Sequence, residues 1–194
     1  MSNNKEKRIY KDKVHLFLAI QRTGTAKDKK CIRHIIKEDE EEELRIFEAK
    51  IKQLSGEWRI HRTVNARDVN KAYKWFMKHM IDYPERASCI DSIWRTALLQ
   101  QECKAEKYFM LDVDTKDEDN LFLFEDLLEC IENSWVNRPK STGDKRLVLV
   151  KIKTPKGYHY ITEPFDTRRI CKLDYVTLIR DGFYYIKTVQ GRKK

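Results

Sequence analysis

Hydrophobic and polar positions along the chain predict a mixture of strands and helices. Short apolar or alternating runs, typical of strands, cover residues 14–20, 57–65, 108–115, 147–153, 158–162, 175–179 and 183–189. Apolar residues recur at helical spacing in four further segments: the second half of 37–56, which Gly56 ends, the segment after Asp68, the segment after Ser88, and 121–135. Helices and strands thus alternate early, and strands cluster late.

Three of these helices have apolar stripes that we expect to be buried. The helix after Asp68 carries Val69, Ala72, Tyr73, Phe76, Met77 and Met80. The next helix follows "SCID" (88–91), which resembles a capping box, and carries Ile93, Trp94, Ala97 and Leu98. The last carries Leu121, Phe124, Leu128, Ile131 and Trp135.

This order of elements favours an α+β fold with a mixed or antiparallel sheet flanked by helices over a doubly wound parallel sheet. Asp181 and Gly182 separate the last two strands, which predicts a tight hairpin there. The chain shows no internal repeat and no composition shift typical of a boundary. We therefore expect one domain over residues 1–194, with residues 1–13 as a flexible basic leader.

Amino-acid composition limits the kinds of partner and compartment that we expect for this chain. The chain has 194 residues, with 40 Lys and Arg against 31 Asp and Glu, a formal charge of +9 that suits a polyanion such as nucleic acid. Its five cysteines form no C-x-x-C pair, so a zinc site or disulfide framework is not expected. No apolar run reaches the length of a membrane span and no signal-peptide core is present, so we expect an intracellular protein without a membrane partner.

Asp112 and Asp114 flank one valine at the end of the apolar run "YFMLDVDT" (108–115). Side chains alternate between the faces of a strand, so both carboxylates share one face, with Cα atoms about 7 Å apart. Carboxylates are the ligands that Mg²⁺ and Mn²⁺ prefer. Two interpretations are open: the pair binds metal, or Asp112 lies at a strand end and Asp114 caps the next helix.

A second set of polar residues surrounds the Pro-Gly turn in "KIKTPKGYHYI" (151–161). The set consists of Lys151, Lys153, Lys156 and His159. Such cationic and hydrogen-bonding groups at one end of a hairpin are what a triphosphate needs opposite a metal. His159 either binds a phosphate in this way or is hydrogen-bonded to its protein neighbours.

Together, "FMLDVDT" and "KTPKGYHYI" resemble the archaeo-eukaryotic primase superfamily, which includes the primase-polymerases of phages and plasmids. That family carries a D-x-D or D-x-E strand, then a small-x-H motif, then a third acidic residue. Residues 112–114 match the first element and residues 157–159 the second. The resemblance implies a primase catalytic-core (RRM-like) fold over about residues 58–189, divalent metal on Asp112 and Asp114, and triphosphate contacts from His159 with Lys153 or Lys156.

The third acid has three candidates, which are Asp166, Asp174 and Asp181. The order of motifs in the family favours Asp181, although Asp181 before Gly182 also suits a hairpin turn. The segment "RTVNARD" (62–68) further resembles a T-x-N segment of plasmid and phage members. That match implies that Arg62, Asn65 and Arg67 lie near the nucleotide or template, whereas helix capping by Asn65 and Asp68 explains part of the pattern without function.

The expected function is therefore a DNA primase or primase-polymerase that joins nucleotides by a two-metal mechanism with Mg²⁺ or Mn²⁺. Its partners are a single-stranded DNA template, NTP or dNTP, and a helicase or other replication protein, in the host cytoplasm if a phage or plasmid encodes it. A restriction-like nuclease would need Glu-x-Lys where Lys151 and Lys153 stand, and a lysyl-adenylate ligase would need a lysine at Ile179. The alternative is a non-catalytic, basic nucleic-acid-binding protein on a degenerate primase scaffold.

Overall fold

A computed structural model describes residues 12–21, 30–36, 39–134 and 146–192, so most of the expected leader, Trp135 and the loop 137–145 lie outside the described residues. The chain divides into two compact units. Unit 1 comprises residues 1–106 and 186–194, and unit 2 comprises residues 107–185. The single domain stays a prediction, because two compact units can belong to one cooperative domain or to two.

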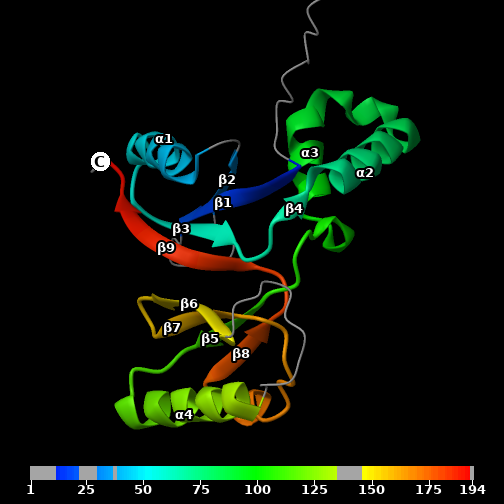
Figure 1. The fold of residues 1–194 in the computed structure, drawn as a ribbon. Coiled ribbons are helices and arrows are strands. Elements are labelled where there is room, and N and C mark those ends of the chain that lie inside the picture. The colour runs from blue at the N-terminus through cyan, green and yellow to red at the C-terminus, as the bar shows by residue number, and fades with distance from the viewer. Residues whose placement is uncertain (1–11, 22–29, 37–38, 135–145, 193–194) are drawn as a thin grey trace, which may run out of the picture. The chain divides into compact units, whose positions relative to one another are not determined.

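Unit 1 is built on a sheet of five strands with β1 at its centre (Figure 1). The strands are β1 (Lys13–Gln21), β2 (Lys30–Ile36), β3 (Glu57–Thr63), β4 (Arg67–Asp68) and β9 (Phe183–Gln190). β1 pairs antiparallel with β2, β3 and β4, and β9 lies next to β3. The division between the units falls inside β9, after Tyr185.

Helix α1 (Glu40–Lys52) covers one face of this sheet with Phe47 and Ile51, which are buried. Their core includes Phe17, Trp58 and Ile60 from the strands. Four glutamates, Glu40 to Glu43, form the first turn of the helix, where negative charge is favourable. Gly56 has φ of 87°, a left-handed conformation that glycine adopts without strain, and it turns the chain from α1 into β3.

Helices α2 (Val69–Asp82) and α3 (Ile90–Leu98) follow, separated by the 3₁₀ segment η2 (Pro84–Cys89). Asp68 caps α2, because its carboxylate accepts a hydrogen bond from the Lys71 amide at 3.0 Å. The expected capping box at 88–91 is wrong: these residues belong to η2 and to the start of α3, whose N-cap makes no side-chain hydrogen bond. The stripe of α2 is narrower than expected, since Tyr73 and Met77 are exposed.

Unit 2 contains a four-stranded antiparallel sheet in the order β6-β7-β5-β8. Its strands are β5 (Phe109–Val113), β6 (Val148–Lys153), β7 (Tyr158–Thr162) and β8 (Val176–Ile179). β5 is central, because a strand pairs with it on each side. Two short 3₁₀ segments, η3 (Gln101–Cys103) in unit 1 and η4 (Ile170–Lys172) in unit 2, complete the described elements.

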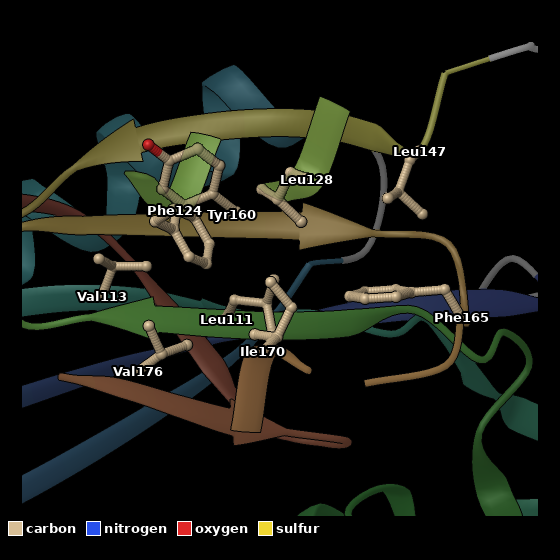
Figure 2. Close-up of a cluster of buried hydrophobic side chains, with 9 residues drawn as sticks. All are labelled: Leu111, Val113, Phe124, Leu128, Leu147, Tyr160, Phe165, Ile170 and Val176. Carbon is tan, nitrogen blue, oxygen red and sulfur yellow. The ribbon is translucent and has the colours of Figure 1, made fainter. Parts of the chain in front are cut away.

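Helix α4 (Glu118–Ser134) covers one face of the unit 2 sheet. Figure 2 shows the core between them, where Leu111 and Val113 of β5 point toward the same cluster as Phe124 and Leu128 of α4. Tyr160 of β7 packs its ring against Phe124 at 5.0 Å between centroids. Because side chains alternate along β5, Asp112, which lies between Leu111 and Val113, points to the other face of the sheet.

The hairpin expected at Asp181-Gly182 is wrong. β8 pairs with β5 and β9 pairs with β3, so the two strands belong to different sheets. A type I′ turn requires positive φ at both central residues, and among the described residues only Gly56 has positive φ. Asp181 and Gly182 therefore lie in a connection between sheets.

The structure confirms an α+β fold with antiparallel sheets and helices, arranged as two sheets where one was expected. Each strand predicted from the pattern is present, with ends shifted by up to a few residues. Within the described ranges, none of the helices has the length and apolar character needed to cross a membrane.

Candidate functional site

One row of side chains crosses the unit 2 sheet on the face opposite to α4. Residues that pair directly across strands point to the same face, and Asp112 pairs with His159 on β7 and with Thr177 on β8. His159 pairs in turn with Ile152 on β6. The register thus brings together the two motifs that the sequence analysis identified separately, at Asp112 and at His159.

Asp112 and His159 are in direct contact. His159 Nε2 lies 3.2 Å from Asp112 Oδ1, with side chains 10% and 29% exposed, respectively. The other ring nitrogen, Nδ1, accepts a hydrogen bond from the Tyr185 backbone N–H at 3.1 Å. Because Nδ1 accepts, the proton of the neutral ring is on Nε2, and it is donated to Asp112. The buried imidazole therefore fixes the orientation of a carboxylate that solvent can still reach.

The turn between β6 and β7 requires a glycine at position 157. A Cβ atom built on Gly157 would lie 1.9 Å from the Val113 carbonyl oxygen and 2.9 Å from that of Thr115. Real contacts of this kind are far longer, so only glycine lets the β6–β7 turn lie against the end of β5. Thr154 holds the turn, since its hydroxyl accepts hydrogen bonds from the Lys156 and Gly157 amides.

Asp114 lies one residue past the end of β5 and is exposed. Its backbone N–H donates to the Tyr175 carbonyl at 2.9 Å, which continues the pairing with the segment before β8. At the first turn of α4 the Asp119 amide donates to Asp117 Oδ1, so Asp117 takes the position that a cap would occupy. The capping role considered for Asp114 thus falls to another residue.

The register separates Asp181 from the other two acids of the expected triad. β8 runs antiparallel to β5, so Ile179 pairs with Met110 and the chain then leaves the sheet in the direction away from Asp114. Asp181 follows two residues after the end of β8, in a bend, so it is not part of the register that aligns Thr177 with Asp112. Asp174 lies at the other end of β8, next to the residue that bonds Asp114.

Asp166, the third candidate, is engaged elsewhere. Its carboxylate accepts hydrogen bonds from the Arg168 amide and from the Arg168 guanidinium, in an exposed turn. Among the three candidates, Asp174 is the one that directly precedes Tyr175, whose carbonyl accepts the hydrogen bond from the Asp114 amide.

Two of the three lysines of the second motif lie on the α4 side of the sheet, and the third lies in the β6–β7 turn. Lys153 pairs with Tyr158 and hence faces the α4 side, opposite to His159. Lys151 lies on that side as well, where it forms an ion pair with Glu125 and contacts the Tyr158 ring at 4.8 Å. Lys156 lies in the turn itself, is exposed and is next to Gly157.

A tyrosine–glutamate pair stabilises the α4 side of the sheet. Tyr160 donates its hydroxyl hydrogen to Glu125. Burial, and then the hydrogen bond to Glu125, raises the pKa of Tyr160. Burial acts to raise the pKa of Glu125, but hydrogen bonds from Lys151 and Tyr160 bring it below its usual value. Glu125 thus stays charged and Tyr160 neutral.

The residues expected from the segment 62–68 belong to unit 1. Arg62 forms an ion pair with Glu40 at 2.6 Å. Asn65 and Arg67 are 0% and 1% exposed, and Arg67 is the largest fully buried side chain in the described part of the chain. Side chains so deeply buried do not present hydrogen-bonding groups to a ligand in solvent, so the structure gives these two residues a place in the interior of unit 1.

The donor set at Asp112 suits a magnesium or manganese site that substrate completes. Within the ranges that the structure describes, three or more His, Cys, Asp or Glu side chains are nowhere grouped as metal ligands. Mg²⁺ in polymerase-type sites is bound by one or two carboxylates together with substrate phosphates and water. Asp112, oriented by His159, and the exposed Asp114 supply carboxylate oxygens of this kind.

Sequence reasoning missed the third partner of the site, the backbone N–H of Tyr185. A backbone donor leaves no signal in the sequence, because every residue except proline has one.

Comparison with protein-family models, curated proteins and solved structures found no match to the chain.

Proposed function

We propose that the chain is a template-dependent nucleotidyltransferase of the primase-polymerase type. The observation that supports this proposal best is the contact between Asp112 and His159 at 3.2 Å. The two motifs behind the resemblance are far apart in the sequence, yet they meet on neighbouring strands. The close approach of Gly157 to β5 adds a physical reason for a small residue two positions before the histidine.

In this proposal Asp112 and Asp114 bind two divalent ions, Mg²⁺ or Mn²⁺, together with the phosphates of the incoming nucleotide. When bound, such ions activate a 3′-hydroxyl and stabilise the departing pyrophosphate. Asp174 is the third acid that fits this arrangement, because it lies beside the segment that bonds Asp114, whereas Asp181 leaves the sheet at the other end.

His159 has two roles in the proposal, and both use the same proton. The Tyr185 amide occupies Nδ1, so Nε2–H is the group that points toward Asp112. This N–H holds the carboxylate for metal binding, and it is also the donor available to a phosphate oxygen once the nucleotide is present. Lys156, in the adjoining turn, is the lysine we assign to the triphosphate, in preference to Lys153 on the α4 side.

The proposed substrates are NTP or dNTP and a single-stranded DNA template. The formal charge of +9 supports a polyanionic partner by counterion release. A helicase or other replication protein is the proposed protein partner, and the cytoplasm is the proposed compartment.

Incorporation of labelled NTPs and dNTPs on single-stranded templates tests the proposal, with and without a primer, in Mg²⁺ and in Mn²⁺. The wild-type chain is expected to give a metal-dependent product, and Asp112→Asn is expected to give none, because the amide has lost the charge that binds the metal. Product from Asp112→Asn at the wild-type rate would refute the proposal.

A second candidate is a non-catalytic nucleic-acid-binding protein. The finding that favours it is that the described residues contain no group of three metal-ligating side chains. No product from either chain, together with equal binding of single strands by wild type and Asp112→Asn, would support this candidate. Binding of that kind should fall steeply with salt.

A further inference from the structure

A groove on unit 1, remote in sequence from Asp112 and His159, lies along helix α2. It encloses a cavity of about 460 Å³ that is open to solvent. Its lining consists of Lys71, Lys74, Trp75, Lys78, His79 and Asp82 of α2 with Glu102 of η3. The residues of α2 in this list recur every three or four positions, so they form one side of the helix.

Planar side chains follow one another along this side of α2, and the first two of them are stacked. The Trp75 and His79 rings lie 4.8 Å apart and within 9° of parallel. The Tyr83 ring lies 4.9 Å from the His79 ring and is tilted by 39° to it, and the Arg86 guanidinium lies 6.0 Å from the centre of the Tyr83 ring. Arg86 also donates to His79 Nε2 at 3.4 Å. Each planar group is thus held by its neighbours, which leaves Trp75 as the first member of a prearranged stack.

The charges of the groove limit what it can bind. Three lysines against two carboxylates leave a net charge of +1 with His79 neutral. A ligand held by phosphate contacts alone would need a larger surplus. A ligand that also stacks on Trp75 gains a second contribution that does not depend on charge, and unpaired nucleobases provide it. Duplex DNA has its bases stacked on each other and presents mainly phosphates.

We propose that the α2 groove binds single-stranded nucleic acid, with a base on Trp75 and backbone phosphates on Lys71, Lys74 and Lys78. The groove would then be a contact surface for the template of the proposed nucleotidyltransferase. This role rests on the proposed function, but the binding itself does not, because it can be measured without synthesis. The groove consists of residues of unit 1, whereas the residues proposed to bind metal and nucleotide belong to unit 2.

Fluorescence anisotropy of a labelled single-stranded oligonucleotide tests the inference with the full chain over a range of salt. Trp75→Ala is expected to weaken binding about 5-fold to 150-fold, the range that corresponds to the loss of one base–aromatic stack. Trp75→Phe keeps a ring and should retain most of the affinity. Lys74→Ala/Lys78→Ala should reduce the slope of log affinity against log salt by about 1.4, because each phosphate contact on a single strand contributes about 0.7.

Tyr73→Ala/Met77→Ala is the matched control, since both side chains are exposed on α2 outside the groove. This variant should bind like the wild type, and thermal unfolding of every variant should show that α2 is still folded. Binding within twofold of wild type for Trp75→Ala, or an unchanged salt slope for the lysine variant, would overturn the inference. Asp112→Asn should bind the oligonucleotide normally, so failure of synthesis and failure of this groove give different results.

Discussion

Two polar segments, one just after β3 and one inside β5, differ in how far the structure buries them. In unit 1, Asn65 and Arg67 are buried to 0% and 1% exposure. In unit 2, the side chain of Asp112 keeps 29% exposure while its partner His159 is 10% exposed. Both segments matched the same family pattern in the sequence, but only the second leaves a reactive oxygen within reach of solvent.

The difference teaches that polarity within a strand does not by itself identify a site. A buried polar group must be hydrogen-bonded in the fold, so Asn65 and Arg67 are best understood as contributors to the stability of unit 1. A site needs a group that stays accessible while a buried neighbour fixes its orientation, and His159 does this for Asp112. Substitutions in the two segments should accordingly separate stability from activity.

The largest effect on stability is expected for Arg67→Ala. Removal of a buried charged side chain leaves the polar groups around it without their partner and creates a cavity. Together these effects cost about 3–5 kcal/mol in the free energy of unfolding. Asp112→Ala should cost about 1 kcal/mol, because one partly exposed hydrogen bond is lost. Denaturant unfolding measures both, and equal midpoints for the two variants would contradict the comparison.

A pH effect of nearly the same size is expected in unit 1, at His15. Burial, and then the positive charge of Arg62, lowers the pKa of His15 from 6.5 to about 4. The unfolded chain therefore binds a proton at a higher pH than the folded chain does, so stability is complete above pH 6.5 and falls as the pH drops toward 4. The loss is about 3 kcal/mol at most.

His15→Gln is the control for this pH effect, since glutamine does not titrate. Its unfolding free energy should depend less on pH between 6.5 and 4 than that of the wild type. Parallel pH profiles for the two chains would show that another group causes the loss.

Gly157→Ala is expected to destabilise unit 2 by about 1–3 kcal/mol, since the new Cβ would collide with the Val113 carbonyl. The collision also moves the turn that precedes His159, so nucleotide incorporation should fall by more than the loss of folded protein explains. Gly182→Ala is the matched control, because its Cβ would meet only a side-chain methyl group of Ile179 at 2.8 Å. Equal loss of activity in both variants would exclude a specific role for the turn.

The smallest effect is expected on the α4 side, for Glu125→Gln. This change removes the charge that binds Lys151 and weakens the bond from Tyr160. Because Glu125 and Lys151 are both partly exposed, the cost should be about 1 kcal/mol or less. Nucleotide incorporation should be unchanged. A loss of incorporation by a well-folded Glu125→Gln chain would indicate that the site lies on the α4 face of the sheet, contrary to the proposal.

The elements with clear periodicity could be predicted from the sequence. The strands at β1, β5 and β7 and the helices α1, α2 and α4 were found because their apolar residues follow the spacing of a buried face. β2 was missed, since it lies at an edge and only Ile36 of its residues is buried. An edge strand with little burial has no apolar pattern to read.

The sequence identified two residues of the candidate site, but it did not reveal how the strands that carry them are aligned. Asp112 and His159 were both identified from the sequence, and the structure brings them into contact. The alignment of β8 with β5, which bears on the choice among Asp166, Asp174 and Asp181, is set by long-range pairing and not by local sequence. The burial of Asn65 and Arg67 likewise follows from the three-dimensional fold and not from local sequence.

Binding of Mn²⁺ in the presence of a nucleoside triphosphate tests the central claim most directly, because it requires the site and not a complete reaction. The free Mn²⁺ signal in electron paramagnetic resonance can be followed for wild type, Asp112→Asn and Asp181→Asn. The account predicts that wild type and Asp181→Asn bind the ion with similar affinity and that Asp112→Asn does not. Undiminished binding by a folded Asp112→Asn chain would contradict it.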